Sequence, residues 1–428
     1  MIEPLESRIA PATLTGRVVK YIDLDGDAVT VTLTKGTLSE ANFVFDSAFA
    51  AAGPQELQKI DLSAVADVAT SNITVAVKKS ATGDGIVNIG AIVATGHDLG
   101  AVKVKGNLGT IVAGTAAQPA PGLASLNVNS LGLVGTSEQA PSFSSITGVA
   151  GRVDITGDLG NAIFATSLSN LKIGGSIIGD GRVFIDGDLT KAVLGGSIVG
   201  QLDAVENELY VRGNLGSLMV RGSVRGGTIT TDFPPSQILV EGNAGKITIG
   251  GDVTGPTGTF EQTTLRVDGT VGTLTIGGSV SGTAALGVII RLADKVNTFG
   301  QGVGSVLIKG STFNMQLGAS VTFTNSQSEV GSITINGAFI SSGIAVSGTA
   351  GMDGKFGTTD DTITASSVIR NLTIKGPVYG TAGAGDSFAI NAGKVMKAKI
   401  SGRVIPLGGG TQTLNIAPSE DVFIRDLV

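Results

Sequence analysis

The chain has 428 residues, a formal net charge of −6 and no cysteine, and 42% of its residues are hydrophobic. These values exclude disulfides and thiolate metal sites. The scattered charges form no basic stripe for nucleic acid, and no apolar run reaches the roughly 18 residues that a membrane-spanning helix requires. The 65 glycines and the aromatic content of only 4% indicate a thin core built from short aliphatic strands.

Residues 1–57 are predicted to form an N-terminal segment and a hairpin cap. Within them, residues 16–46 alternate apolar and polar side chains over two or three strands, with a turn at Asp25 and Gly26. We expect a cap here because the first layer of any strand stack exposes unpaired backbone groups. Beyond the cap, residues 61–68 are expected to form a short helix.

The turn of this hairpin carries three alternating carboxylates, Asp23, Asp25 and Asp27, around Gly26. Carboxylate oxygens are the ligands that calcium prefers, so the pattern predicts a calcium site. An EF-hand is excluded because the twelfth position counted from Asp23 is Thr34 and not a glutamate. The alternative is an acidic hairpin turn that holds no ion.

Residues 58–410 contain a repeated glycine-rich motif, of which LYVRGNLGSLMVRGSVRG at 209–226 is a clear copy. Apolar and polar residues alternate within each copy, which indicates short, half-buried strands. Two or three such strands cannot bury their own apolar face, so each copy must stack on its neighbours. The sequence therefore predicts an all-β fold, a right-handed parallel β-helix (β-solenoid) of about ten irregular coils with caps at both ends. The handedness follows from the preference of parallel crossovers.

Two corners of the repeat have their own residue types. One is marked by a glycine, because a corner needs a positive φ or a close approach of two backbones. These corner glycines are Gly175, Gly196, Gly222, Gly251, Gly278, Gly310, Gly337, Gly376 and Gly402. The other corner carries Asn107, Asn214 and Asn243, with Asp158, Asp188 and Thr270 in the same slot. Asparagine tolerates left-handed backbone and bonds to the backbone at turns, so we expect stacked copies to form a ladder.

Residues 351–364 form a second acidic, glycine-rich segment, with carboxylates at Asp353, Asp360 and Asp361. The segment resembles the calcium loops of secreted repeat proteins, which implies a second calcium site. The alternative is a solvated insertion loop between two strands.

Carboxylates on the coils are also candidates for general acid and base catalysis. The obvious set is Asp154, Asp158, Asp186 and Asp188. Two of them share the corner slot with asparagines, so a role in turns is the simpler interpretation. His97 is the only histidine, which excludes a multi-histidine metal site and leaves no other centre for a hydrolase triad of the usual kind. We therefore predict that the chain is not an enzyme.

Residues 411–428 are predicted to be a C-terminal cap or a docking tail. Charged and large apolar residues return together here, ending in Val422, Phe423, Ile424, Leu427 and Val428. These side chains either close the last coil or dock on another subunit.

Two family resemblances add to this interpretation. The start, with Leu5, Glu6 and Arg8 followed by DLDGDAVTV at 23–31, resembles the Leu-Glu-x-Arg segment and acidic hairpin of large secreted bacterial surface proteins. The coils are also similar to those of the bactofilins, whose rods polymerise end to end, although the steps here are longer and less regular. Both resemblances imply a structural or surface role.

The sequence thus predicts a non-catalytic extracellular scaffold, a rod of the cell surface or matrix. Self-association, including into filaments, or contact with other surface proteins or polysaccharide is expected, without a nucleic-acid partner. The alternative is a carbohydrate-binding or polysaccharide-cleaving β-helix protein, which a groove with exposed aromatic residues and paired carboxylates would favour.

Overall fold

The protein is seen in a computed structural model. It describes residues 11–49, 51, 53–116, 121–134, 141–200, 208–229, 237–259, 263–283, 285–296, 300–321, 328–364, 366–381, 387–408 and 411–426. The regular elements of these residues are β-strands and a single 3-10 turn, η1 (Glu40–Asn42). No helix among them is long and apolar enough to cross a membrane. The helix expected at 61–68 is wrong, because this segment forms tight turns after β5 (Leu57–Asp61).

Contacts divide the chain into two compact units, residues 1–186 and 187–428. The first unit begins with antiparallel strands: β1 (Thr13–Thr15) pairs with β2 (Val18–Ile22), and β2 pairs with β3 (Ala28–Leu33). β3 then pairs antiparallel with β6 (Ser71–Lys78), and β4 (Phe43–Phe45) with β5. The hairpin predicted around residues 25 and 26 is therefore present as β2 and β3.

The pairing in the first unit then becomes parallel. β5 pairs with β7 (Val87–Val93) and β6 with β8 (Leu99–Val104), so the antiparallel cap passes directly into stacked coils. The remaining strands are β9 (Gly106–Ala113), β10 (Pro121–Val128), β11 (Ser130–Leu131), β12 (Ser144–Ile155), β13 (Ala162–Ile173) and β14 (Arg182–Ile185), all paired in parallel within the unit.

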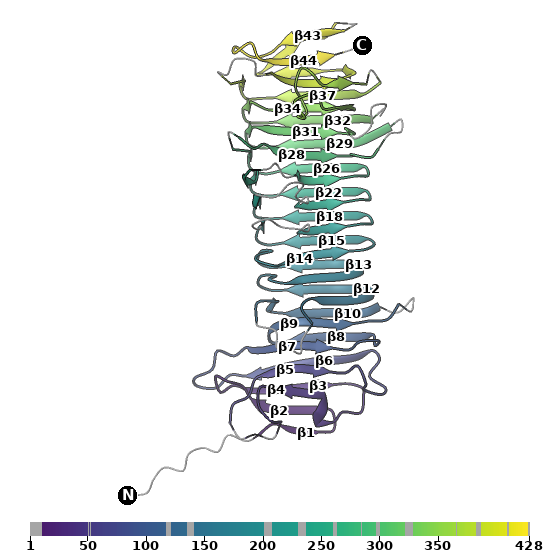
Figure 1. Ribbon diagram of the computed structural model, residues 1–428, viewed down its shortest axis with the longest axis vertical. Helices are drawn as coiled ribbons and strands as arrows, with labels where there is room; N and C mark the ends of the chain where they lie inside the picture. The colour runs from purple at the N-terminus through teal and green to yellow at the C-terminus, as the bar shows by residue number, and fades with distance from the viewer. Residues whose placement is uncertain are drawn as a thin grey trace, which may run out of the picture. The chain divides into compact units, whose positions relative to one another are not determined.

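The second unit consists mainly of three columns of parallel strands. The first column is β15 (Leu189–Leu194), β18 (Leu215–Val220), β22 (Ala244–Ile249), β26 (Val271–Ile276), β29 (Gly300–Ile308), β32 (Ser328–Ile335), β37 (Val368–Ile374) and β41 (Ala398–Ile400) (Figure 1). The second is β17 (Leu209–Val211), β21 (Ile238–Val240), β25 (Thr263–Val267), β28 (Val288–Leu292), β31 (Met315–Ala319), β34 (Gly343–Val346), β39 (Phe388–Ala392) and β44 (Val422–Asp426).

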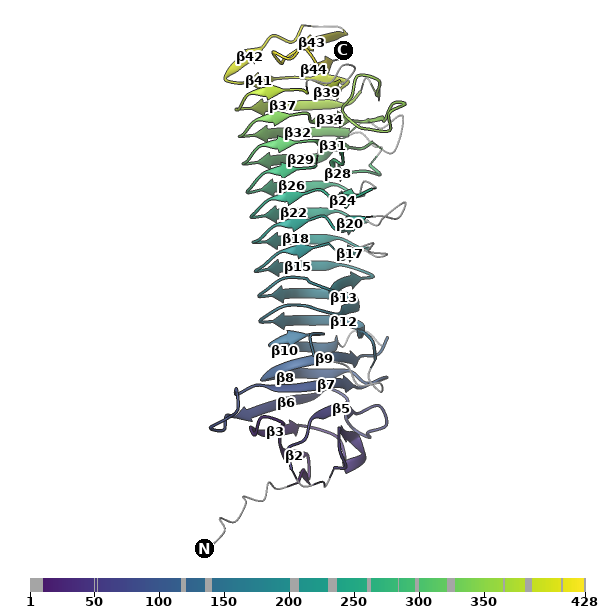
Figure 2. The ribbon, with the colours of Figure 1, turned by 60° about the vertical axis from the view of Figure 1, so that its left-hand side comes forward.

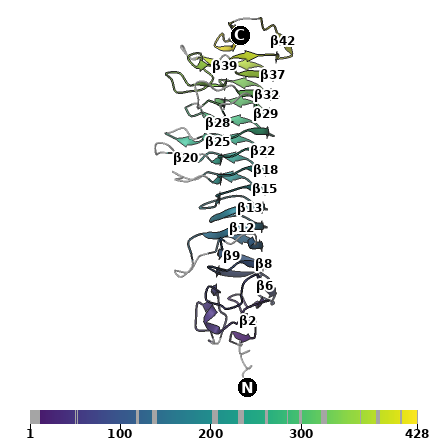
Figure 3. The same cartoon turned by 90° about the vertical axis from the view of Figure 1, so that its right-hand side faces the viewer.

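Two-residue strands make the third column. They are β16 (Ile198–Val199), β19 (Val224–Arg225), β23 (Val253–Thr254), β27 (Val280–Ser281), β30 (Thr312–Phe313), β33 (Phe339–Ile340) and β38 (Val378–Tyr379). Figure 3 views the unit from the side, with β25 and β28 on one edge and β22 and β29 on the other. This repeated, mostly parallel β architecture is compatible with the predicted β-solenoid.

The core of the second unit is a pile of aliphatic side chains in register. Ile249 aligns with Ile276, and the same position is Ile308, Ile335 and Ile374 in the following strands, all of them buried. Burying such a side chain fully contributes roughly 1.5–3 kcal/mol relative to leaving it exposed. The period-two alternation of the sequence therefore becomes an inner column of apolar residues with polar residues outside.

The corner glycines stack directly on one another. The Gly222 N–H donates to the Gly196 carbonyl at 2.9 Å, and the same bond repeats at Gly251, Gly278 and Gly310. None of the glycines in this ladder has a positive φ. A Cβ on Gly310 would lie 2.6 Å from the Gly278 carbonyl oxygen. Close backbone approach, not left-handed backbone, is therefore the reason for glycine at this corner.

The expected ladder forms at the polar corner from Asp188, Asn214, Asn243 and Thr270. The expectation that Asn107 and Asp158 share this slot is wrong, because Asn107 is aligned with Ser130, and Asp158 stacks on Ser176 beside the corner glycine Gly175. The backbone N–H of Asn214 donates to the Asp188 carboxylate at 2.7 Å, that of Asn243 to the Asn214 side chain at 3.0 Å, and that of Thr270 to the Asn243 side chain at 2.8 Å. None of these residues has a positive φ. Each side-chain oxygen thus accepts from the next coil, which satisfies a corner N–H that has no partner in a strand.

Antiparallel strands close the C-terminal end of the second unit (Figure 2). β42 (Arg403–Ile405) lies against β41, and β43 (Gln412–Asn415) against β44. Gly402 differs from the other corner glycines, because it lies in the turn between β41 and β42 and has φ +82°. Val422 and Ile424 of the tail are fully buried as part of the last coil; residues 427 and 428 lie outside the described residues.

Candidate metal centre

The three carboxylates of the first acidic segment converge in the turn between β2 and β3. Oxygen atoms of Asp23, Asp25 and Asp27 lie within 4.8 Å of one another, and among the described residues this is the only such group of three or more potential metal ligands. The turn is tight: the Gly26 N–H donates to the Asp23 carbonyl at 3.0 Å, and the Asp27 N–H to the Asp23 carboxylate at 2.7 Å. Gly26 has φ +96°, which glycine adopts without strain.

A loop that is distant in sequence completes the site. Residues 79–86, which follow β6, surround Asp27: its carboxylate accepts the N–H of Ser80 at 2.5 Å and that of Gly85 at 2.6 Å. Asp84 donates its N–H to the Asp25 carboxylate at 2.9 Å. Gly83 permits this approach, because a Cβ there would lie 1.8 Å from a carboxylate oxygen of Asp27.

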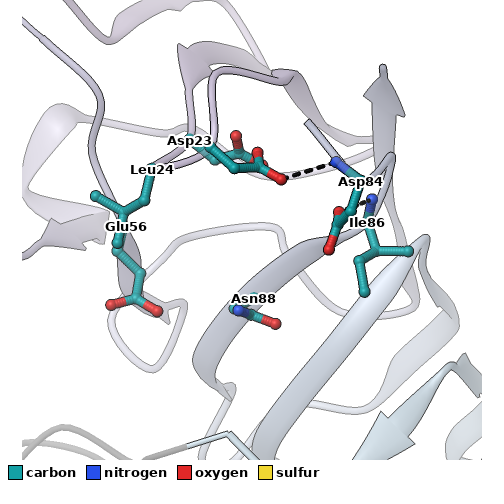
Figure 4. Close-up of a pocket in the computed structure, with 7 residues that line it drawn as sticks. Asp23, Leu24, Glu56, Asp84, Ile86 and Asn88 are labelled. Carbon is teal, nitrogen blue, oxygen red and sulfur yellow. Dashed lines mark hydrogen bonds between the residues drawn. The ribbon is translucent and has the colours of Figure 1, made fainter. Parts of the chain in front are cut away.

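Two of the converging residues, Asp23 and Asp25, border a hollow of about 190 Å³ in the first unit (Figure 4), whereas Asp27 does not line it. Its described lining includes four carboxylates and no basic side chain: Asp23, Leu24, Asp25, Glu56, Asp84, Ile86 and Asn88. None of the ion pairs between described residues involves these carboxylates. Like charges are therefore gathered here without a protein cation to balance them.

The electrostatics of the turn follow from this crowding. Burial, together with a hydrogen bond that the Asp23 carboxyl group donates to Asp25, raises the pKa of Asp23 from 3.8 to about 7. The same hydrogen bond from Asp23, with the Asp84 N–H, lowers the pKa of Asp25. The pair therefore holds one proton, on Asp23, below about pH 7 and loses it as the pH rises through this value.

Tyr21 lies on β2, two residues before Asp23, with its ring edge-on to Phe45. It is 3% exposed, and its hydroxyl has no hydrogen-bond partner among the described residues. Burial raises the pKa of Tyr21 well above 10, and the Asp23 and Glu56 carboxylates raise it further. A buried hydroxyl without a partner is rare in native proteins. No sequence pattern marked Tyr21, Glu56 or Asp84, because their proximity arises only when β2 and the 79–86 loop meet.

The second acidic segment is arranged differently. The Asp361 carboxylate is buried and accepts the Gly357 N–H at 2.7 Å and the Asn391 side-chain amide at 2.8 Å. Asp360 accepts the Thr358 hydroxyl at 2.6 Å, and Asp353 accepts the Lys355 N–H at 2.9 Å. These three carboxylates do not form one of the converging groups among the described residues.

Phe356 holds this second segment against the strands. Its ring is buried with Val321 and Ala345, and the Arg291 guanidinium lies 5.1 Å from the ring centroid. The Phe356 N–H donates to the Gln316 side chain at 3.2 Å. The loop is thus partly packed and not simply solvated.

The four coil carboxylates that were considered for catalysis do not gather at one point. Asp154 forms ion pairs with Arg152 at 2.7 Å and Lys172 at 3.5 Å. Asp158 accepts the Ser176 N–H, and Asp188 belongs to the corner ladder of the second unit. Asp186 is exposed and borders a shallow groove in the first unit. His97 lies in a turn, with its Nε2 3.2 Å from the Ser63 carbonyl oxygen.

That groove contains aromatic residues which the sequence did not single out. Phe143, beside the groove, meets Phe164 edge-on with a centroid distance of 4.9 Å, and Phe164 and Phe184 are tilted by 37° with a centroid distance of 5.4 Å. Phe164 and Phe184 are aligned on neighbouring parallel strands. The groove, of about 210 Å³, is lined by both rings together with Ser145, Ile146, Thr147, Ala165, Thr166 and Asp186.

Comparison of the chain with protein-family models, curated proteins and solved structures finds no match. The resemblances to secreted surface proteins and to bactofilins stay predictions. The residues of the Leu-Glu-x-Arg segment, Leu5, Glu6 and Arg8, lie outside the described residues.

Proposed function

We propose that the chain is a non-catalytic structural scaffold of the cell surface or extracellular matrix. The observation that carries this proposal is the continuous register of the second unit, where successive coils repeat the same inner aliphatic residues and the same two corner ladders. Most residues of these coils serve to hold one coil on the next. In the proposed scaffold, the insertions between strands would contact partner molecules. We take the coils to be right-handed and about ten in number, as the repeat predicts.

The closed ends favour a spacer over an end-to-end filament. A parallel stack grows by adding a strand of the same direction, whereas β42 and β43 run opposite to the strands that they cover. The first unit likewise begins with antiparallel strands. Edges of this kind block continuation of a parallel ladder.

Sedimentation and electron microscopy of the purified full-length chain test the proposal. A spacer predicts monodisperse particles whose sedimentation does not change with concentration, and labelling of producing cells should place them at the outer surface. Fibres at micromolar concentration would contradict the closed ends. Labelling confined to the cytoplasm would contradict the surface role.

The aromatic groove supports a second candidate function, binding of a neutral polysaccharide. Aromatic rings stack on the C–H faces of sugars, and hydroxyl groups bond to the sugar hydroxyls at the rim. Phe164 and Phe184 offer two such rings one strand apart, next to Ser145, Thr147 and Thr166. The described groove lining contains one carboxylate, Asp186, so the arrangement favours binding over acid–base cleavage, which uses two.

Affinity electrophoresis in gels that contain soluble neutral glucans tests this second function. The polysaccharide should retard the wild-type chain, and a Phe164→Ala/Phe184→Ala variant should migrate as in a gel without it. Phe313→Ala, which alters an exposed ring of the second unit, is the matched control. Equal migration of wild type and the double variant would dismiss binding at the groove.

A further inference from the structure

The C-terminal end of the second unit contains a hollow that the spacer role does not require. Residues of β37, of the segment 396–399 and of β42 line it, and its volume is about 350 Å³. Figure 2 shows β41 and β42 at this end of the unit. We propose that the hollow binds a strand of an acidic polysaccharide, in which Lys397 and Lys399 hold the carboxylates of the sugar units.

Positive charge gathers around the hollow without a protein carboxylate to balance it. Lys397 and Lys399 line the hollow, and Lys394, on β40 (Lys394–Val395), and Arg403, on β42, are exposed beside them. None of the ion pairs between described residues involves these four side chains. Residues 387–408 hold four basic and no acidic residues, in a chain whose net charge is −6. This local excess of like charge attracts an anionic partner.

The lining also offers the two other kinds of contact that a sugar polymer uses. Val404 is 77% exposed and Met396 49% exposed, so apolar surface is available for the C–H faces of sugar rings. Thr373 is aligned with Lys399, and Lys399 with Val404. Aligned residues of neighbouring strands share one face of the sheet. A hydroxyl, a cation and an apolar side chain therefore lie next to one another in the hollow.

A file of polar residues continues from the hollow along the first column of strands. Asn371, in the lining, is aligned with Ser332, Ser332 with Ser305, and Ser305 with Thr273. Among the residues of β26, β29, β32 and β37 the only acidic one is Glu329, which is paired with Arg370 at 2.6 Å. An acidic polymer held at the hollow would therefore meet hydrogen-bonding groups, and no unpaired carboxylate of these strands, along the unit.

The lining favours a sugar polymer over other polyanions. Single-stranded nucleic acid is bound largely by stacking of its bases on aromatic rings, and the described lining of the hollow contains none. An acidic peptide would satisfy the lysines, but it offers fewer hydroxyl groups to Asn371 and Thr373. A polymer with a carboxylate and several hydroxyls on each unit matches all three kinds of lining residue.

Isothermal titration of the full-length chain with polygalacturonate, at low ionic strength, tests the proposal. Lys397→Glu/Lys399→Glu should raise the Kd by about tenfold or more, because it replaces two attractions by two repulsions. Both side chains are exposed, so the variant should fold, and its thermal unfolding checks this. Lys20→Glu/Lys309→Glu, which makes the same charge change at exposed positions elsewhere, is the matched control and should keep the Kd within about twofold.

A matched ligand separates the carboxylates from the sugar chain. Fully methyl-esterified polygalacturonate has the same backbone without the charges, and it should bind about tenfold more weakly or worse. Val404→Ser, at an exposed apolar position, should weaken binding of the acidic polymer and leave its salt dependence unchanged, since it removes no charge.

Four outcomes would overturn the proposal. The first two are an equal Kd of wild type and Lys397→Glu/Lys399→Glu, and an equal Kd for the acidic and the esterified polymer. The third is tighter binding of polyglutamate, single-stranded DNA or anionic vesicles, which would assign the hollow to another partner. The fourth is a sedimentation coefficient that rises with concentration in the wild type and not in the lysine variant, which would assign it to a second copy of the chain. The surface role is tested separately, by labelling of producing cells.

Discussion

Two acidic, glycine-rich segments of this chain look alike in sequence and differ in structure. In residues 23–27 the carboxylates face one another across a turn, and Asp25 is exposed beside a hollow without a basic residue in its described lining. In residues 353–361 the buried Asp361 carboxylate faces inward, where a backbone N–H and the Asn391 amide satisfy it. The two segments also differ in spacing, because Asp23, Asp25 and Asp27 alternate whereas Asp353 lies apart from the adjacent Asp360 and Asp361.

The difference lies in the groups that the rest of the fold brings to each segment. The second segment receives donors and an apolar surface, so Phe356 packs against Val321 and Ala345 and its carboxylates are used as structural acceptors. The first segment also receives backbone N–H donors, from Ser80, Asp84 and Gly85, but two further carboxylates, Glu56 and Asp84, come with them. A cluster of donors stabilises a folded loop without an ion, whereas a cluster of acceptors requires a proton or a cation.

The largest expected effect that separates the two segments comes from Phe356→Ala. Removing this buried ring should lower the free energy of unfolding by about 3 kcal/mol, because it leaves a cavity between the loop and the strands. Urea denaturation should show the same loss in EDTA and in calcium. Met352→Ala, at a fully exposed position of the same loop, is the control, and an equal effect of both variants would mean that the loop is not anchored by the ring.

Asp27→Asn and Asp361→Asn form the next comparison. Each replaces a buried carboxylate that accepts backbone N–H groups, so each should lower the free energy of unfolding by about 2 kcal/mol in EDTA. The difference should appear with calcium, since only Asp27→Asn is expected to lose the response. Denaturant titrations of both variants with and without calcium measure this. Loss of the calcium response in Asp361→Asn instead would reverse the assignment of the two segments.

The third comparison concerns the pH dependence of the free energy of unfolding, to which Asp23 in the first segment should contribute. The folded-state pKa of Asp23, about 7, exceeds its ordinary value of 3.8. The stability contributed by its protonated form is therefore complete below about pH 4 and is lost as the pH rises through 7. In EDTA the wild type should lose stability over this range, and Asp23→Asn should lose less. Calcium, which competes with the proton, should stabilise the wild type more at pH 8 than at pH 5.5. A wild-type profile that matches that of Asp23→Asn would show that Asp23 does not titrate in this range.

The smallest effect is expected for Asp360→Asn. This carboxylate is exposed and accepts a hydroxyl of its own loop, so its substitution should change the free energy of unfolding by at most about 0.5 kcal/mol. Thermal unfolding with and without calcium should superimpose on the wild type. A large loss would indicate that the second segment also depends on its exposed charge.

The sequence alone was sufficient to predict the strands, the stacking and the ladders. In a strand that buries one face, apolar and polar residues alternate with period two. In a coil that must match its neighbour, the same residue type recurs at the same corner. Both features can therefore be recognised from short sequence patterns. The ladder from Asp188 through Asn214 to Asn243 follows from such a pattern. The short helix expected at 61–68 is wrong. It was inferred from the composition of this segment alone, whereas the positions of β5 and β6 on either side require tight turns.

The sequence could also point to Asp23, Asp25 and Asp27, but only the tertiary structure decided what surrounds them. The 79–86 loop, Glu56 and the buried Tyr21 hydroxyl come from separate strands and loops, and no periodic pattern connects them. The aromatic cluster of Phe143, Phe164 and Phe184 was missed for the same reason. Its members lie about 20 residues apart and meet only because β12, which Phe143 precedes, pairs in parallel with β13, and β13 with β14. Repetition along the chain specifies the stack, whereas a site depends on which unlike segments the stack brings together.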